Sequence, residues 1–318
     1  MAGGATVIRR LRTLSLPGGA RLWVSASSVA FLASAVVSHG RQLLQLSLDR
    51  QSWLWLALGL GISALSLVVN GLAWGVVLRW LGAAPRWTPV VLLFLESNLR
   101  KYLPGGVWHL LERLRALRSG GPCRQPLSGR QALGAVLLDP LLMAVAALSL
   151  VALGGGLALL ALLPLLALMP RWLNPLLERL ERRRAKALEV DPSGLTPGSL
   201  RLPGYPWWPL AAELVFVLCR FGGFACCVQA FDLAFQLDWT GWLAGFALAW
   251  TAGLVVPAAP GGLGVFEAVL VLRLAASVPE APLLAVALSY RLVVSLADLL
   301  VAAAARRDLA ALRNNGYC

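Results

Sequence analysis

The stretch WLWLALGLGISALSLVVNGLAWGVVL, residues 53–78, decides the fold class of this chain. None of its residues carries a charged side chain. A helix rises about 1.5 Å per residue and needs about 20 apolar residues to cross the hydrocarbon of a bilayer. The stretch is longer than that, so the sequence predicts an integral membrane protein built from helices.

The rest of the chain is similarly apolar. Of its 318 residues, 58% are hydrophobic and 14% are charged, which leaves more apolar surface than one soluble core can bury. The first apolar segment follows a basic N-terminus and is interpreted as an uncleaved signal anchor. We expect a single integral membrane domain over residues 1–318, an all-α helical bundle with about seven spans at residues 22–38, 53–78, 131–152, 155–169, 207–231, 241–257 and 281–305.

The formal net charge of +13 is concentrated between the apolar segments. Lysine and arginine in such connections mark the cytoplasmic side of a membrane protein, which explains them better than a nucleic-acid-binding surface does. We therefore expect both termini in the cytoplasm, together with the basic residues 1–21 and the basic connection 170–206. The five cysteines lack the spacing of metal ligands, and we expect no disulfide, no metal and no cofactor.

Two proline-diglycine breaks interrupt the helical pattern, LPGGV at residues 103–107 and APGGL at residues 259–263. Proline removes a backbone donor and adjacent glycines remove side-chain packing, so a helix is not expected to continue through either break. Non-helical backbone at membrane depth is tolerated only inside protein or beside a wet cavity. The sequence therefore predicts two re-entrant elements, at residues 104–106 and 260–262, and a binding site formed by them.

Ionisable residues inside the predicted spans are costly and need partners or a cavity. Glu213 and Arg220 are seven residues apart, as are Arg291 and Asp298. A step of seven residues returns to nearly the same helical face, so each helix presents one anion and one cation to one side. We expect these four side chains to line a polar cavity for a charged headgroup. Asp139, followed by a proline, marks either a kink or a coupling-ion site.

Both breaks are flanked by polar side chains. Glu267 begins the helix after the second break, where it either caps free amides or orders a cation beside a phosphate that those amides bind. His109 is either a packing residue or a proton carrier. The segment 110–118 alternates leucines with charges and is either an interfacial helix facing anionic headgroups or a hairpin packed on the bundle. The first break has a dense set of polar and aromatic neighbours: Arg100, Lys101, Tyr102, Trp108 and His109.

These motifs resemble a known family, the membrane region of lysylphosphatidylglycerol synthases and related stand-alone proteins. RKYLPGGVWH at residues 100–109 looks like the first signature of the family, and PGGLGVFE at residues 260–267 looks like its second. The resemblance adds Gly261, Gly262 and Tyr290 with its neighbour Arg291 to the expected binding residues. The sequence shows no soluble aminoacyl-transfer domain after the membrane region, so the resemblance implies lipid translocation rather than lysyl transfer.

We therefore expect a flippase-like lipid translocase of a bacterial plasma membrane, with a membrane lipid as its ligand and no catalytic residue. One alternative is an intramembrane subunit of a transferase that modifies aminoacyl or glycosyl lipids. It predicts dependence on a divalent cation and a nucleotide-linked donor. A second alternative is a scaffold for a separately encoded transferase, which predicts a partner protein that co-purifies.

Overall fold

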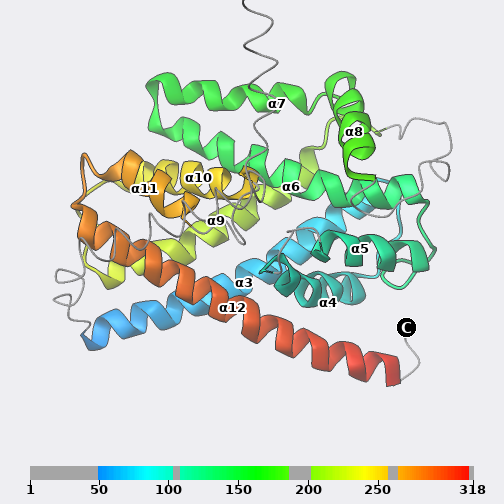
Figure 1. Cartoon of the computed structure of the whole chain (residues 1–318), viewed down its shortest axis with the longest axis horizontal. Coiled ribbons are helices and arrows are strands. Elements are labelled where there is room, and N and C mark those ends of the chain that lie inside the picture. The colour runs from blue at the N-terminus through cyan, green and yellow to red at the C-terminus, as the bar shows by residue number, and fades with distance from the viewer. Residues whose placement is uncertain (1–48, 103–107, 186–201, 257–263, 315–318) are drawn as a thin grey trace, which may run out of the picture.

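The computed structural model describes residues 49–102, 108–185, 202–256 and 264–314, and these parts are helical without a β-strand (Figure 1). The first half contains α3 (Arg50–Trp80), α4 (Trp87–Asn98), the 3-10 helix η1 (Leu99–Tyr102), α5 (Trp108–Ser119), α6 (Gly129–Val151), η2 (Ala152–Gly154), η3 (Gly156–Leu162) and α7 (Leu163–Ala167). The second half contains α8 (Pro170–Ala185), α9 (Trp207–Ala230), α10 (Trp239–Val255), α11 (Val265–Leu274) and α12 (Glu280–Asn314).

Four of the described helices are long and apolar enough to cross a membrane, namely Arg50–Trp80, Gly129–Gly154, Trp207–Ala230 and Glu280–Leu309. A fifth crossing exists if the pair Gly156–Ala167 and Pro170–Leu180, which is bent by 80°, counts as one broken span. The prediction of a polytopic helical membrane protein is confirmed at this level.

The expected count of about seven spans is not confirmed. The segment 22–38 lies outside the described residues, and the segment 241–257 corresponds to α10, whose 17 residues do not qualify as a candidate span. The segment 155–169 forms η3 and α7. The segment begins with Gly155 and Gly156, whose φ angles of 68° and 56° end the preceding helix.

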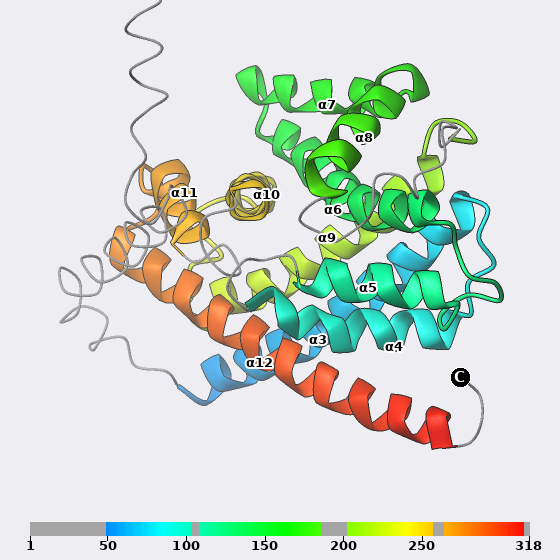
Figure 2. The same cartoon turned by 45° about the vertical axis from the view of Figure 1, so that its right-hand side comes forward.

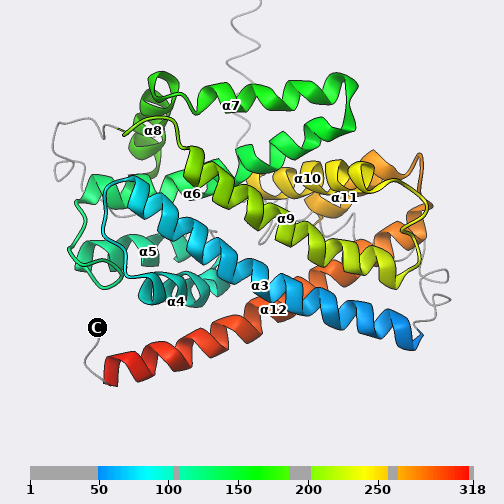
Figure 3. The ribbon, with the colours of Figure 1, turned by 180° about the vertical axis from the view of Figure 1, so that it is seen from behind.

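The centre of the molecule is the close packing of α3 on α9, which run beside each other in Figure 3. Glycines make this approach possible. A Cβ atom on Gly223 would lie 2.4 Å from Ser63 Oγ, and one on Gly59 would lie 3.2 Å from the Gly223 carbonyl oxygen. Small residues at such contacts let helix backbones approach closely within a membrane.

The described segments on either side of the first break, α4 with η1 and α5, form a helical hairpin. At the open end of the hairpin, Arg86 N donates to the Pro122 carbonyl at 2.9 Å, and Arg124 N donates to the Ala84 carbonyl at 3.0 Å. The 12 residues of α4 extend for about 18 Å, which is less than the hydrocarbon thickness. These dimensions fit a re-entrant element, although residues 103–107 themselves lie outside the described parts.

The second break joins α10 and α11, which also pack side by side. A Cβ atom on Gly245, in the first half of α10, would lie 2.8 Å from Leu274 at the end of α11. The two helices therefore run antiparallel. Figure 2 shows α12 running past both hairpins, and this helix contacts α3, α4, η1, α9 and α11.

Candidate functional site

The buried carboxylate of Asp298 in α12 holds the segment just before the first break. Its Oδ2 accepts from Lys101 Nζ at 2.7 Å and from the Tyr102 hydroxyl at 2.6 Å. Its Oδ1 accepts from Asn98 Nδ2 at 2.8 Å. Asp298 is 2% exposed, and these three donors replace water around its negative charge. They fix the end of α4 and η1 to the last helix.

Arg291, two turns before Asp298 on α12, holds the segment just after the second break. Its Nε donates to Glu267 Oε1 at 2.7 Å, and its guanidinium carbon lies 4.9 Å from the centre of the Phe266 ring. Glu267 is fully buried, and its Oε2 accepts from Gly264 N at 2.7 Å at the start of α11. The capping interpretation of Glu267 is confirmed, whereas the phosphate-binding alternative stays a prediction.

The other binding residues predicted near the second break are Gly261, Gly262 and Tyr290. Gly261 and Gly262 lie outside the described residues. The ring of Tyr290 lies in an aromatic cluster, 5.5 Å from the Phe224 ring and 5.6 Å from the Phe266 ring. Its hydroxyl is buried and has no hydrogen-bond partner among the described residues. The ring of Tyr290 therefore packs in the core, while its buried hydroxyl lies one residue before Arg291 on α12.

Arg220 of α9 is buried near the Asp298 clamp, the set of contacts that Asp298 makes with Lys101, Tyr102 and Asn98. Its Nη1 donates to Ser66 Oγ of α3 at 3.2 Å, and its charge acts on both Asp298 and Lys101. Within the described parts of the chain, Arg220 forms no ion pair and its Nε has no hydrogen-bond partner. Since Lys101 already neutralises Asp298, the three side chains together carry one surplus positive charge.

Glu213, the other charged residue of α9, lies in a different cluster. It is fully buried, and both of its carboxyl oxygens lack a hydrogen-bond donor among the described residues. Its neighbours are Asp139 of α6 and Arg113 of α5. Arg113 Nη1 lies 3.4 Å from Asp139 Oδ2, so these two form an ion pair beside Glu213. Two carboxylates and one guanidinium leave one surplus negative charge.

The structure settles the alternatives for the segment 110–118. Its leucines Leu110, Leu111, Leu114 and Leu117 are buried, and so is Arg113, which is 3% exposed. The Arg113 guanidinium carbon lies 3.6 Å from the centre of the Phe94 ring, and Nε donates to Ser97 Oγ at 3.0 Å. The helix is thus the packed half of a hairpin, and the interpretation in which all its cations face lipid headgroups is wrong for Arg113.

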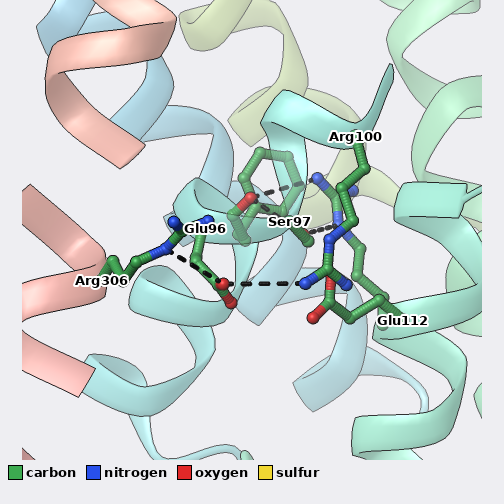
Figure 4. A network of polar contacts seen from close by, with 7 residues as sticks. Glu96, Ser97, Arg100, Glu112 and Arg306 are labelled. Atoms are coloured by element: carbon green, nitrogen blue, oxygen red, sulfur yellow. Dashed lines mark hydrogen bonds and ion pairs between the residues drawn. The ribbon is translucent and has the colours of Figure 1, made fainter. Parts of the chain in front are cut away.

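Arg100 and Glu96 belong to a third polar network, shown in Figure 4. Arg100 forms an ion pair with Glu112 of α5 and lies 3.8 Å from Glu96 of α4. Arg306 of α12 approaches the same Glu96 carboxylate at 3.7 Å. The network connects both arms of the first hairpin to the C-terminal half of α12.

A cavity of about 670 Å³ opens beside this network. Its charged lining residues are Glu96, Arg100, Glu112 and Arg115, so both signs of charge are present. The apolar lining residues come from α4, α5 and the end of α12: Pro89, Leu93, Trp108, Leu111, Ala116 and Leu309. An amphipathic molecule matches this lining, because it offers both charged and apolar side chains.

Trp108 and His109 begin α5 directly after the first break. Trp108 is half exposed and contributes to the cavity wall. His109 Nδ1 is buried without a hydrogen-bond partner in the described part of the chain. α5 is not one of the candidate spans, and burial, followed by the charges of Arg113 and Lys101, lowers the pKa of His109 to about 3. Its imidazole is therefore neutral at physiological pH.

Residues 18–302 match the family described as the lysylphosphatidylglycerol synthase TM region. This match covers most of the chain. The chain belongs to this family. No curated protein matches it.

The described residues that flank both motifs are bound to the same helix, α12. Arg291 and Asp298 do not pair with each other. Arg291 pairs with Glu267 after the second break, and Asp298 pairs with Lys101 before the first break. Among the residues that the structure describes, no group of three or more His, Cys, Asp or Glu side chains is placed to hold a metal ion.

Sequence reasoning missed two members of the site. Asn98 gave no signal, because a single polar residue near the end of an apolar helix is common. Arg113 had one, since a buried Asp139 in a predicted span requires a cationic partner. Arg113 lies on the same face of α5 as the buried leucines, and this position would have selected it.

Proposed function

We propose that this protein is a translocase that moves a lipid with a phosphate-bearing headgroup between the leaflets of a bacterial plasma membrane. The observation that carries the proposal is Arg220, a buried guanidinium with a free Nε donor and no carboxylate of its own among the described residues. A buried cation without an anion is costly. A phosphate oxygen supplies the missing charge and accepts the free donor.

The position of Arg220 supports a moving ligand rather than a static one. Its charge acts on the Asp298 clamp, which fixes η1 and therefore the backbone next to the first break. An anion at Arg220 competes for the same cations, Lys101 included, and loosens that clamp. Headgroup binding and rearrangement of the first hairpin are then linked.

The cavity beside α5 supplies a place where the lipid first contacts the protein. Its charged lining residues include Arg100, which directly precedes Lys101 in the chain, and its apolar lining residues suit acyl chains. The proposed orientation places both termini in the cytoplasm, because the basic connections then lie inside. A separately encoded enzyme that makes the lipid is the expected partner of such a translocase.

Two measurements test the proposal. Mass spectrometry of gently solubilised protein is expected to detect a retained phosphate-bearing lipid, which Arg220→Met loses and Arg307→Met keeps. Arg307 is the control because it is an exposed arginine of α12. In vesicles with fluorescent phosphatidylglycerol, the wild type is expected to expose the probe to an impermeant quencher faster than protein-free vesicles do. Equal lipid retention by both variants, together with equal probe exposure, would contradict the proposal.

A further inference from the structure

Asp139 and Glu213 form a buried carboxyl pair that the binding of a phosphate does not explain. Glu213 is fully buried and Asp139 is 3% exposed. The two carboxyl groups act on each other electrostatically, and Asp139 Oδ1 and both oxygens of Glu213 have no hydrogen-bond partner among the described residues. Ionised carboxylates only accept hydrogen bonds, so the two groups can bond to each other only when one of them carries a proton.

The charged surroundings of the pair are limited. Arg113 is the one described cation that acts on both carboxyl groups, and its direct contact is with Asp139. The same guanidinium is held by the Ser97 hydroxyl and faces the Phe94 ring, so it cannot move freely toward Glu213. From the other helices packed on α6 and α9, no further described charge acts on either carboxyl.

We infer that Asp139 and Glu213 together bind one exchangeable proton, and that this proton is the coupling ion of the proposed translocation. Protonated Glu213 donates to Asp139, Asp139 stays paired with Arg113, and the cluster becomes electrically neutral. Loss of the proton leaves two carboxylates facing one guanidinium without water, which is strongly unfavourable in a low-dielectric interior. The deprotonated cluster is therefore driven to open.

A proton fits this site better than a metal cation. Na⁺ and similar ions need several oxygen ligands, whereas the cluster offers two carboxyl groups with a guanidinium beside one of them. That positive charge repels a second cation. A proton needs only a donor oxygen and an acceptor oxygen, which the pair provides.

The site is linked to the first break through α5. Arg113 lies on the helix that begins at Trp108, directly after residues 103–107, and its ion pair ties that helix to α6. Opening of the cluster breaks the Arg113–Asp139 ion pair and frees α5 from α6. On the other arm of the hairpin, Asp298 binds η1. Proton exchange and movement of the first hairpin are thus mechanically connected. This inference rests on the proposed function for its coupling role but not for the proton site.

The proton site is tested on the full-length protein in nanodiscs by infrared spectroscopy of the protonated carboxyl stretch, recorded in H₂O and D₂O at neutral pH. The wild type is expected to show such a band, which Glu213→Gln removes. Glu267→Gln is the matched control, because Glu267 is equally buried but is satisfied by Arg291 and Gly264 N. Gel filtration confirms that each variant is folded. A wild type without the band, or a band that Glu213→Gln leaves intact, overturns the inference.

The coupling role is tested separately in vesicles that carry the fluorescent lipid probe. A pH gradient is expected to change the translocation rate of the wild type, and in Glu213→Gln the ratio of rates with and without the gradient is expected to fall to unity. Replacement of Na⁺ by choline is expected to change nothing, and a Na⁺ requirement overturns the choice of the proton. If the infrared band behaves as expected but neither the wild type nor any variant translocates lipid, the proposed function fails and the proton site stands.

Discussion

The clamp between α12 and the first break makes a direct prediction for Asp298→Asn. The substitution keeps the shape of the side chain but removes its charge and turns one acceptor oxygen into a donor. Lys101 loses its counter-ion, and Tyr102 and Asn98 compete for a single remaining acceptor. The exposed Asp308 on the same helix provides the matched control, Asp308→Asn.

The size of the effect follows from the burial of the pair. Removing one partner of a buried ion pair costs about 3 to 5 kcal/mol. The side chain of Lys101 is 23% exposed, so water compensates part of this loss and the lower figure, about 3 kcal/mol, applies. Each 1.4 kcal/mol is about a factor of ten, so the equilibrium for opening η1 from α12 shifts by about two orders of magnitude.

Amide hydrogen exchange in nanodiscs measures this opening, because exchange of protected amides follows the local opening equilibrium. Peptides from η1 are expected to exchange about 100 times faster in Asp298→Asn than in the wild type, and peptides from α3 and α9 are expected to be unchanged. Asp308→Asn is expected to exchange like the wild type. Equal protection of η1 in all three proteins would refute the clamp.

Other contacts make three further predictions. Arg291→Ala is expected to lower the free energy of unfolding by about 3 kcal/mol, because it leaves Glu267 unpaired. In a double-mutant cycle, Arg291→Ala combined with Glu267→Gln should cost less than the sum of the single changes, as measured by thermal unfolding in detergent. Gly223→Ala is expected to lower stability by about 1 to 3 kcal/mol, because its Cβ would lie 2.4 Å from Ser63 Oγ. The control Gly61→Ala should be neutral or stabilising, because its Cβ would meet nothing within 4 Å. Equal melting temperatures of the two variants would contradict this packing. His109 has a folded pKa of about 3, well below its ordinary value of 6.5, so the unfolded chain binds a proton that the folded chain does not, and stability should fall by about 1.4 kcal/mol per pH unit below pH 6.5. His109→Gln should remove this part of the acid sensitivity, and an unchanged pH profile of unfolding would count against the buried neutral imidazole.

The helical membrane architecture was predictable because its signals are local. A run such as residues 53–78 carries its length and apolarity in one stretch, and α3 follows it closely. The breaks rest on an equally local signal, since proline and glycine act on their own backbone, but residues 103–107 and 257–263 lie outside the described parts. The described helices on either side of them are η1 and α5, and α10 and α11.

The pairing of the buried charges was not predictable, because it depends on contacts between distant segments. The spacing of Arg291 and Asp298 correctly placed both on one helix, but their partners come from α11 and η1. The expected number of spans was not confirmed for a related reason. Apolarity alone marked residues 155–169 as a crossing, whereas two glycines with positive φ and an 80° bend make it part of a broken pair.

The two charged residues of α9, Glu213 and Arg220, differ from the other buried charges of the bundle. Lys101 neutralises Asp298, Arg291 neutralises Glu267, and Arg113 neutralises Asp139. Among the described buried charges, Arg220 and Glu213 are then the two without an ion pair, and they lie on the same helix about 10 Å apart along its axis. An anionic headgroup at Arg220 and a proton at Glu213 would each cancel one of them. Uptake of both together leaves every described buried charge of the bundle compensated, and uptake of either alone does not. Because this balance favours joint binding, it predicts that a bound phosphate-bearing lipid raises the proton affinity of the carboxyl pair.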